Sequence, residues 1–105
     1  MKMGNLAKMA EQMQAEMAQA QAELRETTLE ATAGGGAVRV VITGAQELRA
    51  VHIDPAAADP GDVEMLQDLI LAAVNEALAR SKQLADDKMT AIAGSMGLPG
   101  LPGLR

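Results

Sequence analysis

The sequence predicts an α+β fold in which an N-terminal helix and a long C-terminal helix flank a three-stranded antiparallel meander. Apolar residues recur at spacings of three and four near the start of the 105-residue chain and again in its second half. Between these regions lie three short β-branched segments separated by glycine-containing turns. We expect one domain over residues 1–93, followed by a Gly/Pro/Leu-rich tail over residues 94–105.

The first helix is expected over residues 5–26, where Ala, Gln, Glu and Met favour helix. Asn5 is placed to cap its start. Its apolar positions form a heptad seam for packing on the second helix: Met3, Leu6, Ala10, Met13, Met17, Ala20 and Leu24. Met9 lies beside this seam, where a methionine can serve as an adaptable contact residue.

Three strands are expected over residues 27–32, 37–43 and 48–53. Turns are indicated at residues 34–36 (Gly-Gly-Gly) and 44–46, and the short connections favour an antiparallel meander. Alternation places Val38, Val40 and Ile42 on one face, with Arg39, Val41 and Thr43 on the other. In the third strand it places Val51 and Ile53 on one face and Leu48 and Ala50 on the other. Two helices leave part of such a sheet uncovered, which favours a homodimer.

The second helix is expected over residues 60–92 and would be roughly 50 Å long. Asp59 is expected to cap it, Pro60 suits its first position, and Asp62 and Glu64 complement the helix dipole. A helix of this length should project beyond the sheet at one end. The tail from Gly94 contains Gly-x-x triplets that superficially resemble collagen, but three triplets cannot sustain a triple helix, so disorder is expected.

Several functional classes are disfavoured by the composition. The chain has no cysteine, so it can form neither a disulfide nor a thiolate metal site. The single histidine, His52, has no partner for a metal or catalytic role, and the glycine run leads into a strand rather than into the helix of a phosphate-binding loop. We therefore expect no enzyme activity, no cofactor and no small-molecule substrate.

The apolar runs are too short for a membrane span, and the N-terminal region lacks the hydrophobic block that a secretory signal contains. These features predict a soluble, intracellular protein without a membrane partner. The formal net charge of −5 argues, taken alone, against nucleic acid. If the helices pack antiparallel, however, the start of the first and the end of the second form a net basic tip. The alternative is an ordinary mixed surface.

Five stretches of the sequence match one family of bacterial proteins in the same order. They are residues 5–14 (NLAKMAEQMQ), 40–44 (VVITG), 53–55 (IDP), 66–77 (LQDLILAAVNEA) and 88–89 (KM). Together with the predicted order of elements, these stretches resemble the YbaB/EbfC family of nucleoid-associated proteins. The resemblance extends to about residue 97.

The resemblance implies a tweezer-like homodimer, joined through its sheets, that binds duplex DNA and alters its conformation. It implies roles in nucleoid organisation, gene regulation and DNA protection, and a cytoplasmic, nucleoid location. Within the sheets, the expected dimer interface is Val41, Val51 and Ile53. The expected DNA-binding residues are Lys2, Lys8, Arg80, Lys82 and Lys88, with Arg39 and Arg49 as a second set.

No aromatic side chain is available to stack on bases, so a preference for single strands is not expected. An alternative from another class is a non-enzymatic adaptor whose helical arms grip a protein partner through Met9 and its apolar neighbours.

Overall fold

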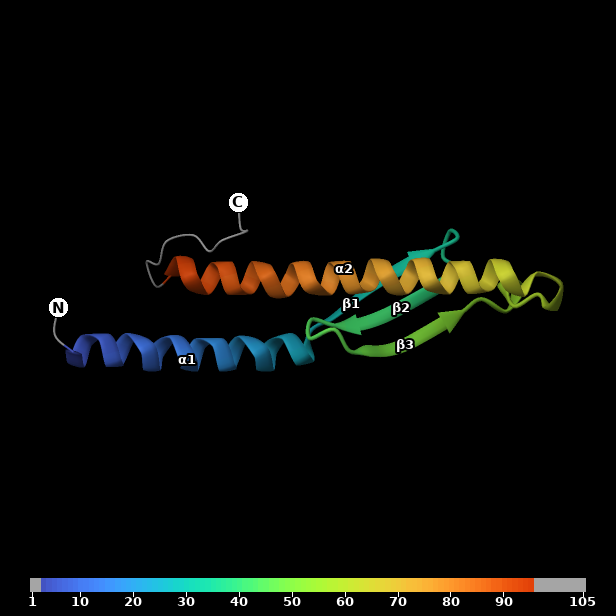
Figure 1. Ribbon diagram of the computed structural model, residues 1–105. Coiled ribbons are helices and arrows are strands. Elements are labelled where there is room, and N and C mark those ends of the chain that lie inside the picture. Colours follow the sequence, from blue (N-terminus) through green and yellow to red (C-terminus); the bar gives the residue numbers. More distant parts are fainter. Residues whose placement is uncertain (1–2, 96–105) are drawn as a thin grey trace.

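The computed structural model describes residues 3–95, with side chains from residue 4 onward (Figure 1). The elements follow the predicted order, and the predicted fold class is confirmed. They are α1 (Met3–Glu26), β1 (Thr28–Ala33), β2 (Val38–Thr43), β3 (Leu48–Ile53) and α2 (Val63–Ser95), with 3-10 turns η1 (Pro55–Ala57) and η2 (Pro60–Asp62) before α2. The body measures 70 × 26 × 16 Å. It is therefore elongated rather than spherical.

The sheet is an antiparallel meander of order β1-β2-β3 whose one face is covered by α2 (Figure 1). Val38, Val40 and Ile42 of the central strand are fully buried beneath α2. The core around them is completed by Ala31, Ala73 and Ala77, with Leu29, Ala33, Leu66, Leu69, Ile70, Val74 and Leu78 at its margin. The alanines on the facing sides of α2 and β1 allow the helix to lie close to the sheet.

The edge strand β3 is left largely uncovered, because α2 packs mainly on β1 and β2. Leu48, Val51 and Ile53 are 47%, 44% and 37% exposed. Helix α1 does not cover a face of the sheet; it lies beyond the end of the sheet and reaches it near the β2–β3 turn (Figure 1). One face of β3 therefore carries apolar side chains without a full cover from residues 3–95.

The predicted placement of Leu48 on the same face as Ala50 is wrong. A β-bulge interrupts the register between Val41 and Ile42, so that Val41 pairs with Ala50 whereas Ile42 pairs with Leu48. The extra residue, Arg49, shifts the alternation by one position. Leu48 consequently joins Val51 and Ile53 on the face of the sheet that α2 partly covers.

Two predicted helix caps are also wrong. Helix α1 begins at Met3, so Asn5 lies inside it. Asp59 caps the 3-10 turn η2 by accepting from the Gly61 N–H at 2.9 Å. The start of α2 is capped instead by Asp62, whose Oδ1 accepts from the Met65 N–H at 3.2 Å. For this reason α2 begins three residues later than predicted, and it continues to Ser95 rather than ending at residue 92.

The two helices run antiparallel, and beyond the sheet α2 lies beside α1 (Figure 1). Ala20 and Leu24 of α1 and Ala93 of α2 are buried between them, and the Lys88 ammonium lies 3.0 Å from the Glu23 carboxylate. The predicted projection of α2 beyond the sheet is thus confirmed.

The predicted seam is correct for the second half of α1 and wrong for the first half. Leu6 is 49% exposed and Ala10 is exposed, while Met13 and Met17 are half-buried. Counting along the antiparallel pair from Lys88 beside Glu23, the last described residue of α2, Ser95, lies near Glu16. The first half of α1 therefore extends past the described end of α2. The side chain of Met3 and residues 96–105, on which most of the predicted tail falls, lie outside the described part.

Candidate nucleic-acid interface

Four of the cationic side chains predicted to bind DNA lie next to carboxylates. Arg39 is 3.1 Å from Glu30, Arg80 is 2.9 Å from Glu76, and Lys88 is 3.0 Å from Glu23, with Arg49 more loosely placed at 3.9 Å from Glu47. These pairs are partly exposed, so each contributes little to stability. Their charges are nevertheless locally balanced, which weakens the field that each presents to a phosphate.

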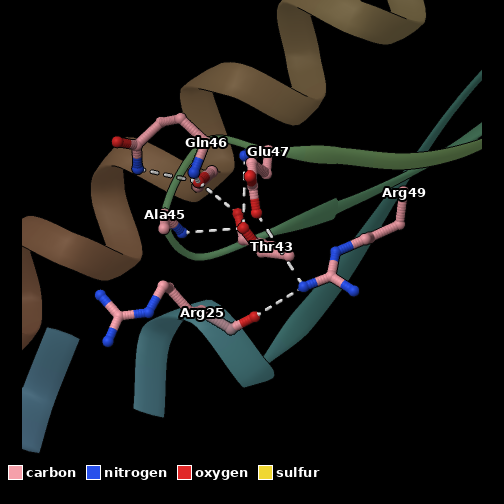
Figure 2. Close-up of polar contacts among 7 residues, drawn as sticks. Arg25, Thr43, Ala45, Gln46, Glu47 and Arg49 are labelled. Carbon is pink, nitrogen blue, oxygen red and sulfur yellow. Dashed lines mark hydrogen bonds and ion pairs between the residues drawn. The ribbon is translucent and has the colours of Figure 1, made fainter. Parts of the chain in front are cut away.

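Two of these arginines also hold backbone carbonyls in place. Arg80 Nη1 donates to the Glu30 carbonyl of β1 at 2.8 Å, and Arg49 Nη2 donates to the Arg25 carbonyl of α1 at 3.2 Å. Figure 2 shows the Arg49 guanidinium reaching toward the end of α1. Both side chains therefore have a structural role in addition to any contact with DNA.

The structure does not gather the predicted basic tip in one place. Lys8 precedes Glu23 by fifteen residues, so it lies roughly 22 Å along α1 from the level of Lys88. Lys2 lies outside the described residues. Arg39 alternates with the buried Val38 and Val40, so it lies on the face of the sheet opposite to α2, and Arg49 lies at the bulge. The candidates are thus distributed along the molecule.

Lys8, Arg25 and Lys82 form no ion pair with any residue in the range 3–95. All three are exposed. Arg25, in the last turn of α1, lies beside a shallow hollow between the helices and the β2–β3 turn. Its lining is Gln21, Leu24, Arg25, Gly44, Ala45, Gln46, Ala85 and Met89. Lys82 precedes Ala85 by three residues and therefore lies on the same side of α2.

Arg25 was not among the candidates predicted from the sequence. One available signal was the absence of an acid three or four residues away on the helix, at Gln21 and Ala22. The guanidinium of Arg25 points away from the turn in Figure 2, while its backbone carbonyl faces Arg49. Arg25 and Lys82 thus place two exposed cations near this hollow, and Asp86 follows Lys82 by four residues on the same side of α2.

The opposite groove of the helix pair carries acids. It is lined by Glu16, Glu23 and Lys88 among others. The hydrogen bond from Lys88, followed by its charge, lowers the pKa of Glu23 below its ordinary value. The carboxylate thus stays ionised at neutral pH, and this groove is a poorer surface for a phosphate than the hollow beside Arg25.

A comparison with protein families identifies the chain. The model of the YbaB/EbfC DNA-binding family matches residues 1–96. The chain belongs to the YbaB/EbfC DNA-binding family. The resemblance found in the sequence is therefore confirmed.

Several curated members of this family are close to the chain in sequence. A nucleoid-associated protein of Moorella thermoacetica is 57% identical over 103 residues, covering 95% of this chain and 99% of its own length. Nucleoid-associated proteins of Ruminiclostridium cellulolyticum and Nocardia farcinica are 50% and 48% identical. They cover 97% and 96% of this chain, and 87% and 92% of their own lengths.

The YbaB-like fold is also seen in a solved structure. The crystal structure of an uncharacterised protein from Helicobacter pylori has a TM-score of 0.71 and 24% identity, and the match covers 91% of this chain and 97% of the other. At this level of identity the likeness supports the fold and not a particular activity.

Metal-binding clusters and membrane-spanning helices are absent from the described part of this YbaB/EbfC chain. Among residues 3–95 no three His, Cys, Asp or Glu side chains are grouped so that they could hold a metal ion. In the same range neither helix is long and apolar enough to cross a membrane.

Proposed function

We propose that this chain binds duplex DNA as a homodimer, through contacts to phosphates rather than to base edges, and alters the conformation of the DNA. The observation that carries the proposal is membership of the YbaB/EbfC DNA-binding family over residues 1–96. The names of the curated relatives, nucleoid-associated proteins, support a cytoplasmic, nucleoid location. The proposal includes roles in nucleoid organisation, gene regulation and DNA protection.

Exposed cations without a carboxylate partner are the best phosphate contacts, because binding need not break an ion pair. Lys8, Arg25 and Lys82 have this character within the described part of the chain. Lys2, Arg80 and Lys88, together with Arg39 and Arg49, are secondary candidates. Each cation that neutralises a phosphate releases counterions and makes binding depend on salt. Since the chain has no aromatic residue for stacking on bases, duplex DNA is favoured over single strands.

The uncovered strand β3 supports the homodimer. It is an edge of the sheet, and Leu48, Val51 and Ile53 expose apolar surface there. Pairing with β3 of a second copy would satisfy the free backbone groups and bury these side chains. Of the predicted interface residues, Val51 and Ile53 share this face, whereas Val41 pairs with Ala50 on the opposite face. Val51 and Ile53 are therefore the better candidates.

Fluorescence anisotropy of a labelled 30-base-pair duplex, titrated at several salt concentrations, tests the proposal. We expect affinity to fall steeply with salt. Lys82→Gln should reduce the slope of log K against log salt by about 0.9 for each phosphate that is no longer neutralised. Lys82→Arg is the matched control, because it keeps a positive charge at the same exposed position and should leave the slope unchanged. Equal effects of the two substitutions would contradict a phosphate contact at Lys82.

A second function, an adaptor for a protein partner, is favoured by the exposed first half of α1. Leu6 and Met9 are 49% and 37% exposed there, and the acidic net charge of −5 suits a basic protein partner. The same titration separates the two functions. An adaptor would show no salt-sensitive retention of duplex DNA.

A further inference from the structure

The C-terminal end of α1 is held by hydrogen bonds from outside the helix. Carbonyls in the last turn of a helix have no partner within it. Here the Leu24 carbonyl accepts from the Gly44 N–H at 2.9 Å, and the Arg25 carbonyl accepts from Arg49 at 3.2 Å. The Glu23 carbonyl accepts from Thr27, whose backbone N–H and hydroxyl lie 2.9 and 2.8 Å away. The β2–β3 hairpin therefore supplies two of these caps.

The same hairpin turn is tied to the middle of α2 by a buried serine. Ser81 Oγ donates to the Thr43 carbonyl at 2.6 Å. It accepts from the Gln46 backbone N–H at 3.1 Å and from Gln46 Nε2 at 2.9 Å. Ser81 and Thr43 are fully buried, so the Thr43 carbonyl would lose a donor if the hydroxyl were removed, and the exposed Gln46 would lose its link to α2. We name residues 43–47 with Ser81 the turn clamp.

Gln46 adopts an unusual backbone conformation within the turn clamp. Its φ angle is +64°, a left-handed value that glycine or asparagine adopts more readily than glutamine. The glutamine side chain compensates, because its Nε2 donates both to Ser81 and to the Gly44 carbonyl, the latter at 2.8 Å. Figure 2 shows this side chain folded back over the turn. The left-handed backbone of Gln46 is thus held by a specific set of hydrogen bonds, which fixes the geometry of the turn.

The turn clamp lies at the C-terminal end of the long helix α1. Helix α1 has 24 residues and is about 36 Å long, and Leu6, Met9 and Ala10 in its first half are exposed. A tilt of about 10° at the clamp would move its far end by about 6 Å. That displacement exceeds the reach of an ion pair, which is about 4 Å.

We propose that Ser81 and Gln46 are positioning residues that fix the angle between α1 and α2, and thereby hold the cations of the two helices in register for DNA. The part of this inference that concerns DNA rests on the proposed function. The part that concerns the helix angle does not, and it can be measured without DNA.

The angle between α1 and α2 is tested with the full chain. Because the chain contains no cysteine, spin labels attach only to cysteines that are introduced. Cysteines replace the exposed residues Ala7 on α1 and Thr90 on α2, and labelled chains are diluted with an excess of unlabelled chains, so that measured pairs lie within one chain. Double electron–electron resonance then gives the distribution of distances between the helices. The test variant is Ser81→Ala.

The control is Ala77→Gly, which is one turn earlier on the same buried side of α2 and destabilises the helix without touching the clamp. Both variants are measured well below their melting temperatures. We expect Ser81→Ala to broaden the distance distribution and to weaken binding of the 30-base-pair duplex by roughly two- to thirtyfold. Ala77→Gly should leave both quantities at the wild-type value.

Each outcome bears on the inference separately from the proposed function. A narrow, wild-type distribution in Ser81→Ala would overturn the clamp. A broadened distribution with unchanged DNA affinity would overturn the link to binding. If the wild type fails to bind DNA, the proposed function fails, but the distances still decide the helix angle. Should Ser81→Ala not fold, Gln46→Gly removes the amide donor while easing the left-handed backbone, and the same two measurements apply.

Discussion

Replacing Gly44 with alanine is expected to force the end of α1 away from the β2–β3 turn. A Cβ atom at this position would lie 2.7 Å from Leu24 Cδ2, 3.1 Å from the Leu24 carbonyl oxygen and 3.2 Å from Leu84 Cδ2. Leu24 is only 4% exposed, so its side chain has little room to yield. The contact with the carbonyl oxygen is with backbone, and it would also disturb the hydrogen bond from the Gly44 N–H.

Overpacking of this kind costs about 1–3 kcal/mol. For a domain of this size, 1 kcal/mol lowers Tm by about 4–8 °C, so the expected loss is between about 4 and 24 °C. Circular dichroism at 222 nm measures Tm, with protein concentration fixed because the melting of a dimer depends on it. Gly94→Ala is the control, since among the described residues no atom apart from the chain neighbours and the nearby backbone of α2 lies within 4 Å of the added methyl group, and the site is helical. An unchanged Tm in Gly44→Ala would refute the close approach.

Three further outcomes are expected. Val51→Glu should convert the proposed homodimer to monomers in sedimentation equilibrium, because it places a charge on the uncovered face of β3; a dimer of undiminished affinity would exclude this interface. The lowered pKa of Glu23 stabilises the fold above the ordinary pKa of a glutamate, and this contribution is lost as pH falls through the lower, folded value. Lys88→Gln should therefore flatten the acid dependence of Tm, whereas an unchanged profile would show that the pair is screened. Ile42→Val should cost about 0.5–1.5 kcal/mol in urea denaturation, because Ile42 is fully buried under α2; no loss would mean that this core is loosely packed.

The order and type of the elements were predictable because each depends on local chemistry. The glycine run at 34–36 turns with positive φ at all three residues, and β-branched segments form the strands on either side of it. Errors occurred where two local signals competed. Asp59 and Asp62 both resemble caps in the sequence, and only the backbone path through η2 shows that Asp62 caps α2.

The candidate site was predicted only in part, because the sequence shows charges but not their neighbours in space. Lys8 and Lys82 were among the predicted residues and are free of ion pairs in the described chain, whereas Lys88 lies against Glu23 from a distant segment. Arg25 was missed for the same reason. Which cation is balanced by which acid depends on the antiparallel alignment of α1 with α2.

The methionine-rich first helix shows where the sequence stops being informative. Its heptad spacing by itself determined that a helix forms and which side is apolar. The tertiary structure decided that only the second half of that side is buried, at Ala20 and Leu24, while Leu6 and Met9 stay exposed. The physical reason is the length of the helices and their alignment. The turn clamp fixes which part of α2 lies beside the C-terminal end of α1, and the described part of α2 ends before the first turns of α1 are reached.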